Sequence, residues 1–246
     1  MKYFTRIVVI FFFPLLWSCS DDSPSPKEYL QPDIPASNNN IINQSPVVKK
    51  FTFLALGDSY TIGHGVSEEM RWPNQLKDRL LKESVSLEKV DIIAQPGWTT
   101  SALLYAIDQK QPDQYDMVSL LIGVNNQYQK RLFEEFQEEF RELLDIALNL
   151  SGESQRVFVV SIPDYGVTRY GSANPEGIAT EINNYNGFIR GYCEEKNVPF
   201  VDVTEISRTL AASDGALASD ALHPSGYQYS LWVEKIVPVV LELLEP

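Results

Sequence analysis

The chain has 246 residues, of which 44% are hydrophobic and 22% are charged, so it can bury one sizeable core like an ordinary globular protein. It carries 33 acidic and 20 basic side chains, a formal net charge of −13, and it has no basic stripe. Because phosphate contacts need clustered Lys and Arg, this balance argues against nucleic acid as a partner and against adhesion to anionic lipid through charge alone.

The first predicted element is a secretory signal over residues 1–18. Lys2 and Arg6 precede a short apolar run at residues 7–17, and small residues follow this run. This order of a basic, an apolar and a small-residue region is typical of a signal peptide. The apolar run is too short to cross a bilayer as a stable helix.

A lipid anchor is predicted at Cys19. Residues 16–19, Leu-Trp-Ser-Cys, resemble a bacterial lipobox, in which the mature protein begins at the cysteine and its thiol carries lipid. The next acidic pair, Asp21 and Asp22, resembles the surface-export signal of lipoproteins in the Bacteroidetes group. We therefore expect an extracytoplasmic lipoprotein at the outer membrane or cell surface of a Gram-negative bacterium. Ordinary secretion with an incidental cysteine is the alternative.

A tether is predicted between this anchor and a single folded domain. Residues 20–48 are rich in Ser, Asp, Pro and Asn and have no periodic apolar pattern. Such composition favours an extended linker, which we place with the lipidated cysteine over residues 19–49. The folded domain is then expected over residues 50–246. Its own cysteine, Cys193, lies in a helical pattern and is expected to be a small buried side chain rather than half of a disulfide.

From residue 50 onward, strand-like and helix-like patterns alternate. Apolar runs of strand length occupy residues 51–56, 90–94, 117–122, 157–162 and 200–203. Helical periodicity occupies residues 72–82, 100–109, 133–150, 178–196 and 227–244. Pro238 should kink the last helix or limit its length. Strands that alternate with helices and are apolar throughout predict a parallel sheet between two helical layers.

Candidate functional residues follow the predicted strands, and functional sites in open parallel sheets lie at the carboxyl ends of the strands. Gly57-Asp58-Ser59 follows the first apolar run, and Gly97 and Asn125 lie just after the second and third. Asp220 and His223 precede the last helix. The convergence of four separate segments on one edge is more specific than any one of these short motifs.

Three of these residues form a possible nucleophile, base and orienting group. The Ser59 hydroxyl needs a base to take its proton during attack, and the imidazole of His223 is the natural candidate. Asp220, three residues before His223, can fix the tautomer of this ring. The negative charge that develops on an attacked carbonyl needs nearby donors. The candidates are the backbone N–H groups of Ser59 and Gly97 and the side-chain amide of Asn125.

At these positions the chain resembles the GDSL or SGNH ester hydrolases. The four residues of the family name, Ser, Gly, Asn and His, fall on Ser59, Gly97, Asn125 and His223, and Asp220 is the Asp of the family's Asp-x-x-His. The resemblance covers roughly residues 51–246. It implies a flavodoxin-like three-layer α/β/α sandwich with a central parallel sheet, and hydrolysis of lipid esters, aryl esters, thioesters or carbohydrate acetyl groups without a metal or other cofactor.

Three positions depart from the common family pattern. Tyr60 replaces a Leu, Gln95 replaces an Asn two places before the glycine, and Asn126 stands where an Asp often follows the catalytic Asn. Tyr60 should tune the pocket without preventing catalysis. The other two positions bear on how the loops around the site are braced.

Four more residues have two interpretations each. Trp98 and Tyr128 are tentative substrate-binding residues, although aromatic side chains at such places more often belong partly to the core. His64 could line the cleft, but we expect a solvated or helix-capping residue, and not the base. Asp58 is expected to brace its turn rather than transfer protons. No His or Cys cluster has metal-ligand spacing along the chain, so no metal site is predicted.

The sequence thus predicts a serine hydrolase that cleaves small acyl, acetyl-carbohydrate or lipid esters through an acyl-enzyme intermediate. Its expected partner is a small-molecule or glycan ester, selected by loops such as residues 165–175. Two alternatives remain. One is a non-catalytic surface lipoprotein that binds glycan, and the other is acyl transfer to a carbohydrate acceptor instead of water.

Overall fold

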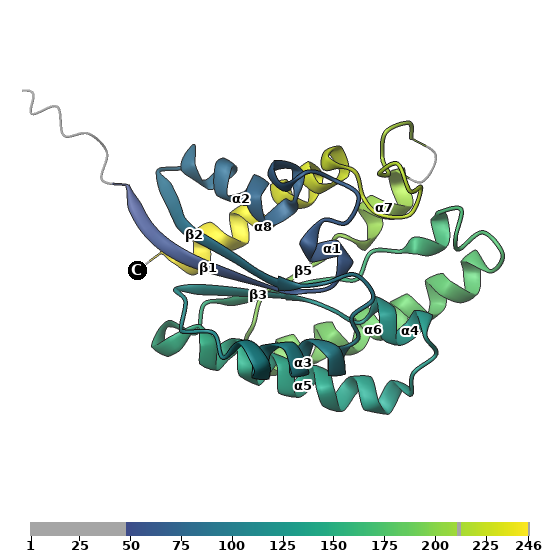
Figure 1. Cartoon of the computed structure of the whole chain (residues 1–246), viewed down its shortest axis with the longest axis horizontal. Helices are drawn as coiled ribbons and strands as arrows, with labels where there is room; N and C mark the ends of the chain where they lie inside the picture. Colours follow the sequence, from purple (N-terminus) through teal and green to yellow (C-terminus); the bar gives the residue numbers. More distant parts are fainter. Residues whose placement is uncertain (1–47, 211–212, 246) are drawn as a thin grey trace, which may run out of the picture. The chain divides into compact units, whose positions relative to one another are not determined.

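A computed structural model describes residues 48–210 and 213–245 (Figure 1). The predicted signal segment and Cys19 lie outside the described residues, as does the predicted tether up to residue 47. Within the described ranges, no helix is both long enough and apolar enough to cross a membrane.

Five strands form one parallel sheet in the order β2-β1-β3-β4-β5. The strands are β1 (Lys49–Gly57), β2 (Val85–Ala94), β3 (Met117–Leu121), β4 (Val157–Val160) and β5 (Phe200–Val201). This is the flavodoxin-like order, and it confirms the predicted fold class. All five predicted strands are present. The prediction began β2 at residue 90, because the first half of this edge strand carries exposed polar residues rather than a continuous apolar run.

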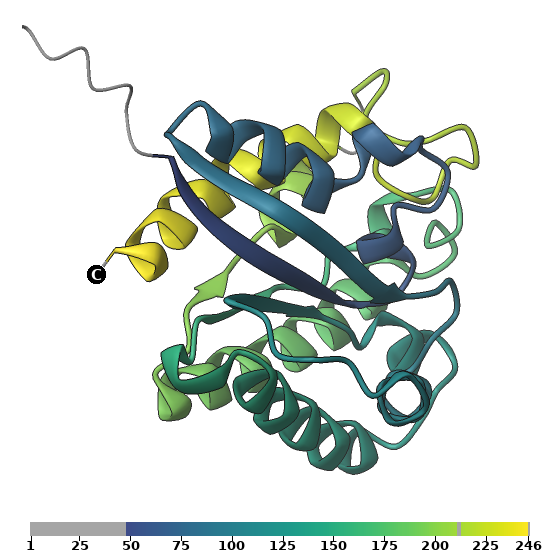
Figure 2. The same cartoon turned by 60° about the vertical axis from the view of Figure 1, so that its left-hand side comes forward.

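Helices cover both faces of the sheet. α2 and α8 pack together on one face, whereas α3, α5 and α6 lie on the other (Figures 1 and 2). These helices, all predicted, are α2 (Trp72–Leu81), α3 (Thr100–Lys110), α5 (Phe133–Leu150), α6 (Pro175–Lys196) and α8 (Gly226–Leu244). The sequence did not predict three shorter helices, which are α1 (Ser59–Ile62), α4 (Val124–Tyr128) and α7 (Thr204–Leu210). Too few turns fit in them for an apolar stripe to show.

The helices pack against the sheet through apolar faces, most of which were predicted from the sequence. The stripe of α5 is fully buried at Phe136 and Phe140, and Cys193 of α6 is likewise buried, as expected. Of the two predicted effects of Pro238, a kink or a limit on the length of α8, the limit is wrong, because the helix continues to Leu244. Val240 is buried beyond the proline, so packing against the sheet offsets the lost backbone hydrogen bond.

The carboxyl ends of three strands are in register. Gly57, the last residue of β1, pairs with Ala94 of β2 and with Leu121 of β3. The segments that follow these strands therefore leave the sheet at the same level. The chain turns to opposite sides of β1 to form β2 and β3, which makes this edge the topological switch point where such sheets bind ligands.

Gly57 permits this alignment because it has no side chain. A Cβ atom at Gly57 would lie 2.2 Å from Thr61 Oγ1 and 2.5 Å from the carbonyl oxygen of Leu121. Both distances are far below van der Waals contact. The turn that carries Ser59 can therefore pack against the end of β3 only with glycine at this position.

We expect Gly57→Ala to destabilise the fold by about 1–3 kcal/mol or more, as overpacking of a tight interior does. Urea unfolding measures this change. Gly187→Ala is the matched control, because a Cβ at this exposed position in α6 meets nothing within 4 Å. The control should be neutral or stabilising by up to about 1 kcal/mol, since alanine favours helix over glycine. Equal stabilities for the two variants would contradict the close-packing role of Gly57.

Candidate active site

A cavity of about 220 Å³ opens at the switch-point edge and brings together residues from separate segments of the chain. Five of the predicted site residues line it, namely Ser59, Gly97, Asn125, Tyr128 and His223. The other lining residues are Tyr60, His64, Pro96, Val124, Tyr165, Tyr170 and Leu222. The expectation that functional residues follow the strands and converge on one edge therefore agrees with the geometry.

Ser59 is the first residue of α1 and lies directly after the β1 turn. It is 5% exposed, and it lines the cavity. Asp58 caps the helix, because its Oδ1 accepts a hydrogen bond from the backbone N–H of Tyr60 at 3.0 Å. Asp58 therefore braces the turn, as predicted. No hydrogen bond joins Ser59 to His223 in the described part of the chain, and such bonds commonly tighten only when substrate is bound.

His223 is oriented by Asp220. The Nδ1 atom of His223 lies 2.6 Å from Asp220 Oδ2, which leaves Nε2 free for proton transfer. Burial would raise the pKa of the Asp220 carboxyl, but hydrogen bonds from His223 and from two backbone N–H groups outweigh it and lower the pKa. Burial also lowers the pKa of the His223 imidazole below its ordinary value of 6.5, against the opposing effect of Asp220. At neutral pH the ring is therefore neutral and able to accept a proton.

The segment that carries this pair is fixed by backbone hydrogen bonds. Asp220 Oδ1 accepts from the backbone N–H groups of Leu222 and His223 at 2.9 and 3.0 Å. The carbonyl oxygen of His223 accepts from the N–H of Ala218 at 2.8 Å, beside an antiparallel bridge between Leu217 and Pro224. The carboxylate and the imidazole are thus held on one tight turn just before α8.

Gly97 and Asn125 lie on facing loops after β2 and β3. Gly97 has φ = +83°, a conformation that favours glycine, and a Cβ there would meet no atom within 4 Å. Asn125 Nδ2 donates to the carbonyl oxygen of Trp98 at 2.9 Å. One N–H of this amide group is therefore committed to the loop, and the other remains for a ligand in the cavity.

The two loops are cross-linked by the neighbours of Asn125. Asn126 is buried, its Oδ1 accepts from the backbone N–H of Thr100 at 3.0 Å, and its Nδ2 donates to Thr100 Oγ1 at 2.6 Å. Gln129 Nε2 donates to the carbonyl oxygen of Gly97 at 3.1 Å. The amide of Asn126, in place of the family's common Asp, therefore braces the loop that holds Gly97.

Tyrosines form one wall of the cavity. Tyr128 and Tyr170 are 61% and 58% exposed, and the ring of Tyr165 packs edge-on against Tyr128 with 6.0 Å between centroids. Trp98 does not line this cavity, because its half-buried ring packs against the core and borders a separate surface groove. Its substrate role stays a prediction. Tyr165 and Tyr170 follow β4, so the strand-end rule pointed to their loop but not to the individual residues.

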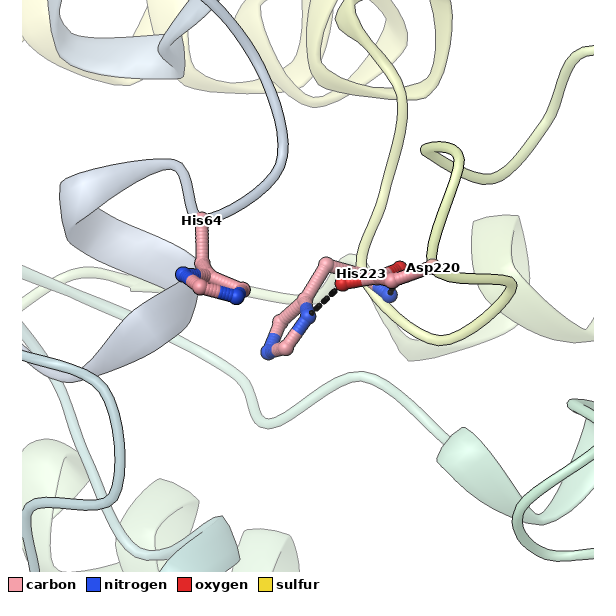
Figure 3. A group of neighbouring side chains, drawn as sticks. All are labelled: His64, Asp220 and His223. Carbon is pink, nitrogen blue, oxygen red and sulfur yellow. Dashed lines mark hydrogen bonds and ion pairs between the residues drawn. The ribbon is translucent and has the colours of Figure 1, made fainter.

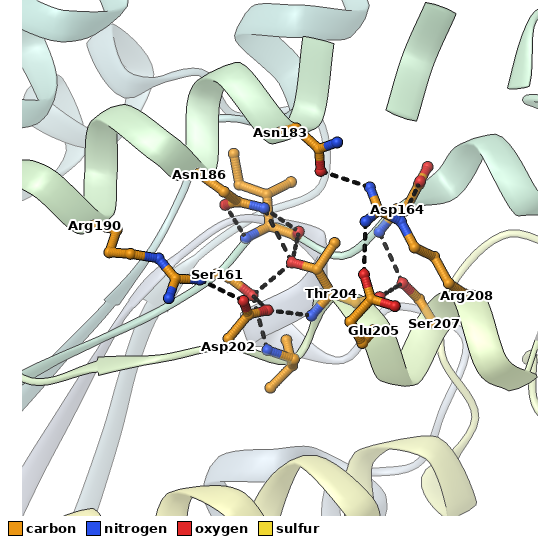
Figure 4. Close-up of polar contacts among 12 residues, drawn as sticks. Ser161, Asp164, Asn183, Asn186, Arg190, Asp202, Thr204, Glu205, Ser207 and Arg208 are labelled. Carbon is orange, nitrogen blue, oxygen red and sulfur yellow. Dashed lines mark hydrogen bonds and ion pairs between the residues drawn. The ribbon is translucent and has the colours of Figure 1, made fainter. Parts of the chain in front are cut away.

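A buried polar network lies after β4 and includes Asp164, the residue before Tyr165 (Figure 4). Asp164 is almost fully buried, pairs with Arg208 Nε at 2.9 Å and accepts from the backbone N–H of Gly166 at 2.8 Å. Its own N–H donates to Ser207 Oγ at 2.9 Å. Because Arg208 and Ser207 both belong to α7, this network ties the start of the loop that carries Tyr165 to α7.

His64 lies against His223. The two rings meet edge to face with centroids 4.8 Å apart, and His64 is exposed to solvent while it lines the cavity. The structure thus favours the cleft-lining interpretation of this residue over helix capping. Spacing along the chain could not show this pair, because the loop after α1 and the turn before α8 meet only in the fold.

Asp58 is also electrostatically unusual. It is fully buried, and its Oδ2 atom has no hydrogen-bond partner in the described part of the chain. Burial raises the pKa of this carboxyl to about 7, although the backbone N–H of Tyr60 opposes the shift. The carboxyl beside Ser59 therefore holds its proton far more tightly in the folded chain than in the unfolded chain.

We expect the stability of the wild-type protein to fall, relative to Asp58→Asn, as the pH rises from 5 to 8. The unfolded carboxyl loses its proton near 3.8 and the folded one near 7, so the folded state binds the extra proton between these values. At about 1.4 kcal/mol per pH unit, the difference should grow by about 3 kcal/mol over this interval. Urea unfolding of both proteins at several pH values measures it. A difference that does not change with pH would show that Asp58 keeps an ordinary pKa.

Comparisons with known proteins agree with this geometry. A model of the GDSL-like lipase/acylhydrolase family matches residues 55–231, which is more than half of the chain. No curated protein matches the chain.

Several solved structures share the fold. A lipase/acylhydrolase from Enterococcus faecalis has a TM-score of 0.58 at 24% identity, covering 80% of this chain and 98% of that one. An esterase, EstA, from a Pseudoalteromonas species, inhibited by monoethylphosphonate, has a TM-score of 0.57 at 17% identity, covering 78% and 98%. A lipolytic G-D-S-L family protein from Veillonella parvula has a TM-score of 0.60 at 17% identity, covering 77% and 98%. The chain therefore belongs to the GDSL-like lipase/acylhydrolase family and is a carboxylic ester hydrolase.

Proposed function

We propose that this hydrolase cleaves small acyl esters through an acyl-enzyme intermediate on Ser59. One observation carries the proposal. A single cavity is lined by Ser59, by His223 with its bond to Asp220, and by Gly97 and Asn125. These are a nucleophile, an oriented base and two donors for a developing negative charge, which together are the parts needed for acyl transfer.

In the proposed first step, Ser59 Oγ attacks the acyl carbon while His223 Nε2 takes the hydroxyl proton. Asp220 stabilises the resulting imidazolium through Nδ1. The carbonyl oxygen, now negative, accepts hydrogen bonds from the backbone N–H groups of Ser59 and Gly97 and from Asn125 Nδ2. The C–O bond to the alcohol then breaks, and His223 returns the proton to the leaving oxygen. Water repeats the sequence and releases the acid, which regenerates Ser59.

The size and lining of the cavity support a short acyl group. Its volume of about 220 Å³ lies below the roughly 300–1,000 Å³ of pockets that enclose drug-sized ligands. Leu222 and Val124 add apolar surface to the cavity that Ser59 lines, whereas Tyr128 and Tyr170 line the same cavity and are exposed to solvent. We place the acyl group inside and the alcohol, a small molecule or a glycan, against the exposed tyrosines. Such rings offer flat surfaces for a sugar or an aryl group.

We also propose that the domain lies outside the cytoplasm and is anchored to a membrane by a lipid attached to Cys19. The support is the sequence of residues 1–22, with its basic start, short apolar run and lipobox-like Leu-Trp-Ser-Cys. Metabolic labelling with a radioactive fatty acid in a bacterial host should mark the wild-type chain and not Cys19→Ser. Equal labelling of the two chains, or none, would rule out this anchor.

The function is tested with p-nitrophenyl esters from acetate to decanoate, using a Cys19→Ser background and the same chain with Ser59→Ala. We expect the highest kcat/KM for the shortest esters and a loss of up to about 10⁶-fold in kcat for Ser59→Ala, as removal of a triad nucleophile causes. A fluorophosphonate should label the protein at Ser59, which the loss of labelling in Ser59→Ala confirms. Full activity without Ser59 would contradict the mechanism, and a preference for decanoate would contradict the short acyl group.

The same assay measures the contribution of one oxyanion donor. Asn125→Ala should lower kcat by roughly 10²–10³ while KM changes little, because the donor acts mainly on the transition state. Asn184→Ala is the matched control, since this exposed asparagine lies on α6 and away from the cavity. An unchanged kcat for Asn125→Ala would remove this residue from the oxyanion site.

A further inference from the structure

We propose that His64 and His223 form a binding site for a transition-metal ion such as Zn²⁺, and that the bound ion inhibits the hydrolase. Figure 3 shows the ring of His64 turned toward the ring of His223, with Asp220 on the far side of His223. One donor atom from each of these three residues lies within 4.8 Å of the others. His64 and His223 are also the two histidines of the chain, so both of its imidazoles meet at this point.

The bond between His223 and Asp220 already has the form found in metal sites. A histidine that binds a metal through one ring nitrogen usually donates the N–H of its other nitrogen to a carboxylate, which fixes the ring and raises its basicity. Here Asp220 Oδ2 accepts from Nδ1 at 2.6 Å. Nε2 of His223 is therefore the ligand atom we assign, and Asp220 acts through it as the outer partner.

His64 can complete the site without a change in the backbone. Bonds of about 2.0–2.1 Å place two nitrogen ligands of a tetrahedral zinc ion about 3.3 Å apart. One ring nitrogen of His64 and one of His223 lie within 4.8 Å of each other, and the exposed His64 ring makes no side-chain hydrogen bond in the described part of the chain. A small rotation of this side chain brings its ring nitrogen to that distance. Water from the open cavity fills the remaining coordination positions.

Inhibition follows from the atom that the metal occupies. Nε2 is the atom that must take the proton of Ser59, so a metal bound there removes the base and blocks the cavity. Imidazole favours Zn²⁺, Cu²⁺ and Ni²⁺, whereas Mg²⁺ and Ca²⁺ favour oxygen ligands. The site should therefore distinguish these two groups of ions.

The inhibition is measured on the purified full chain carrying Cys19→Ser, which removes a thiol that could also bind metal. Zn²⁺ is titrated into the p-nitrophenyl acetate assay, and each variant is compared with its own metal-free rate. His64→Gln should raise the half-inhibitory Zn²⁺ concentration by about tenfold or more, because one of two protein ligands is lost. Glu69→Gln, an exposed carboxylate on the same segment, is the control and should behave as wild type. Equal Zn²⁺ sensitivity of His64→Gln and wild type, or inhibition by Mg²⁺ at the same concentration, would overturn the proposal.

A direct measurement of metal binding tests this site independently of the proposed enzymatic function. Only the inhibitory effect of the metal rests on that function. Calorimetric titration of Zn²⁺ into the Ser59→Ala chain should show one ion per chain, and His64→Gln in that background should weaken this binding by about tenfold or more. Binding that is absent, or unchanged by His64→Gln, overturns the metal site even if the esterase is fully active. If the chain hydrolyses no ester but binds the ion as expected, the proposed function fails and the site stands.

Discussion

The active site depends on the register of three strand ends. Gly57 pairs with Ala94 on one side and Leu121 on the other, and its missing side chain lets the turn after β1 lie directly against β3. The loops that carry Ser59, Gly97 and Asn125 therefore start from a common level of a rigid parallel sheet. Shifting one strand by a residue would move its loop by about 3.3 Å, which is more than a catalytic hydrogen bond tolerates.

Hydrogen bonds between the loops further fix the positions of the residues that follow the strands. Asn125, Asn126 and Gln129 all form hydrogen bonds with the segment from Gly97 to Thr100, so the proposed oxyanion donors are linked to one another and not only to their own strands. Such preorganisation matters because a donor that must reorient during the reaction contributes less to the transition state. The network around Asp164 likewise fixes the loop that carries Tyr165.

Periodicity predicted the five strands and the five long helices, because each buries a continuous apolar run or stripe. It could not predict α1 or α4, which are short helices in the loops around Ser59 and Asn125; Asp58 caps α1, and α4 has no side-chain cap at its start. The convergence of Ser59, Gly97 and Asn125 on one cavity could be predicted because their motifs follow strands in order, and His223 could be added because its short motif with Asp220 precedes the last helix. Their roles in the reaction stay predictions. The pair of His64 and His223 could not be predicted, since the two residues are far apart in sequence and meet only through loop packing. The position of Tyr165 in the cavity wall could not be predicted either, because it follows from polar contacts between Asp164 and α7 that form only in the folded chain.

The proposed base and its orienting carboxylate share one tight turn, whereas the proposed nucleophile belongs to another element. Two hydrogen bonds join Asp220 to His223, and a third joins Asp220 to the backbone N–H of Leu222, so one short segment holds both side chains. Their mutual geometry therefore depends mainly on this one turn. The distance to Ser59, by contrast, is set by how the segment before α8 rests on α1. The proposed triad therefore consists of two separately held parts, and the packing between them sets the distance over which the proton must move.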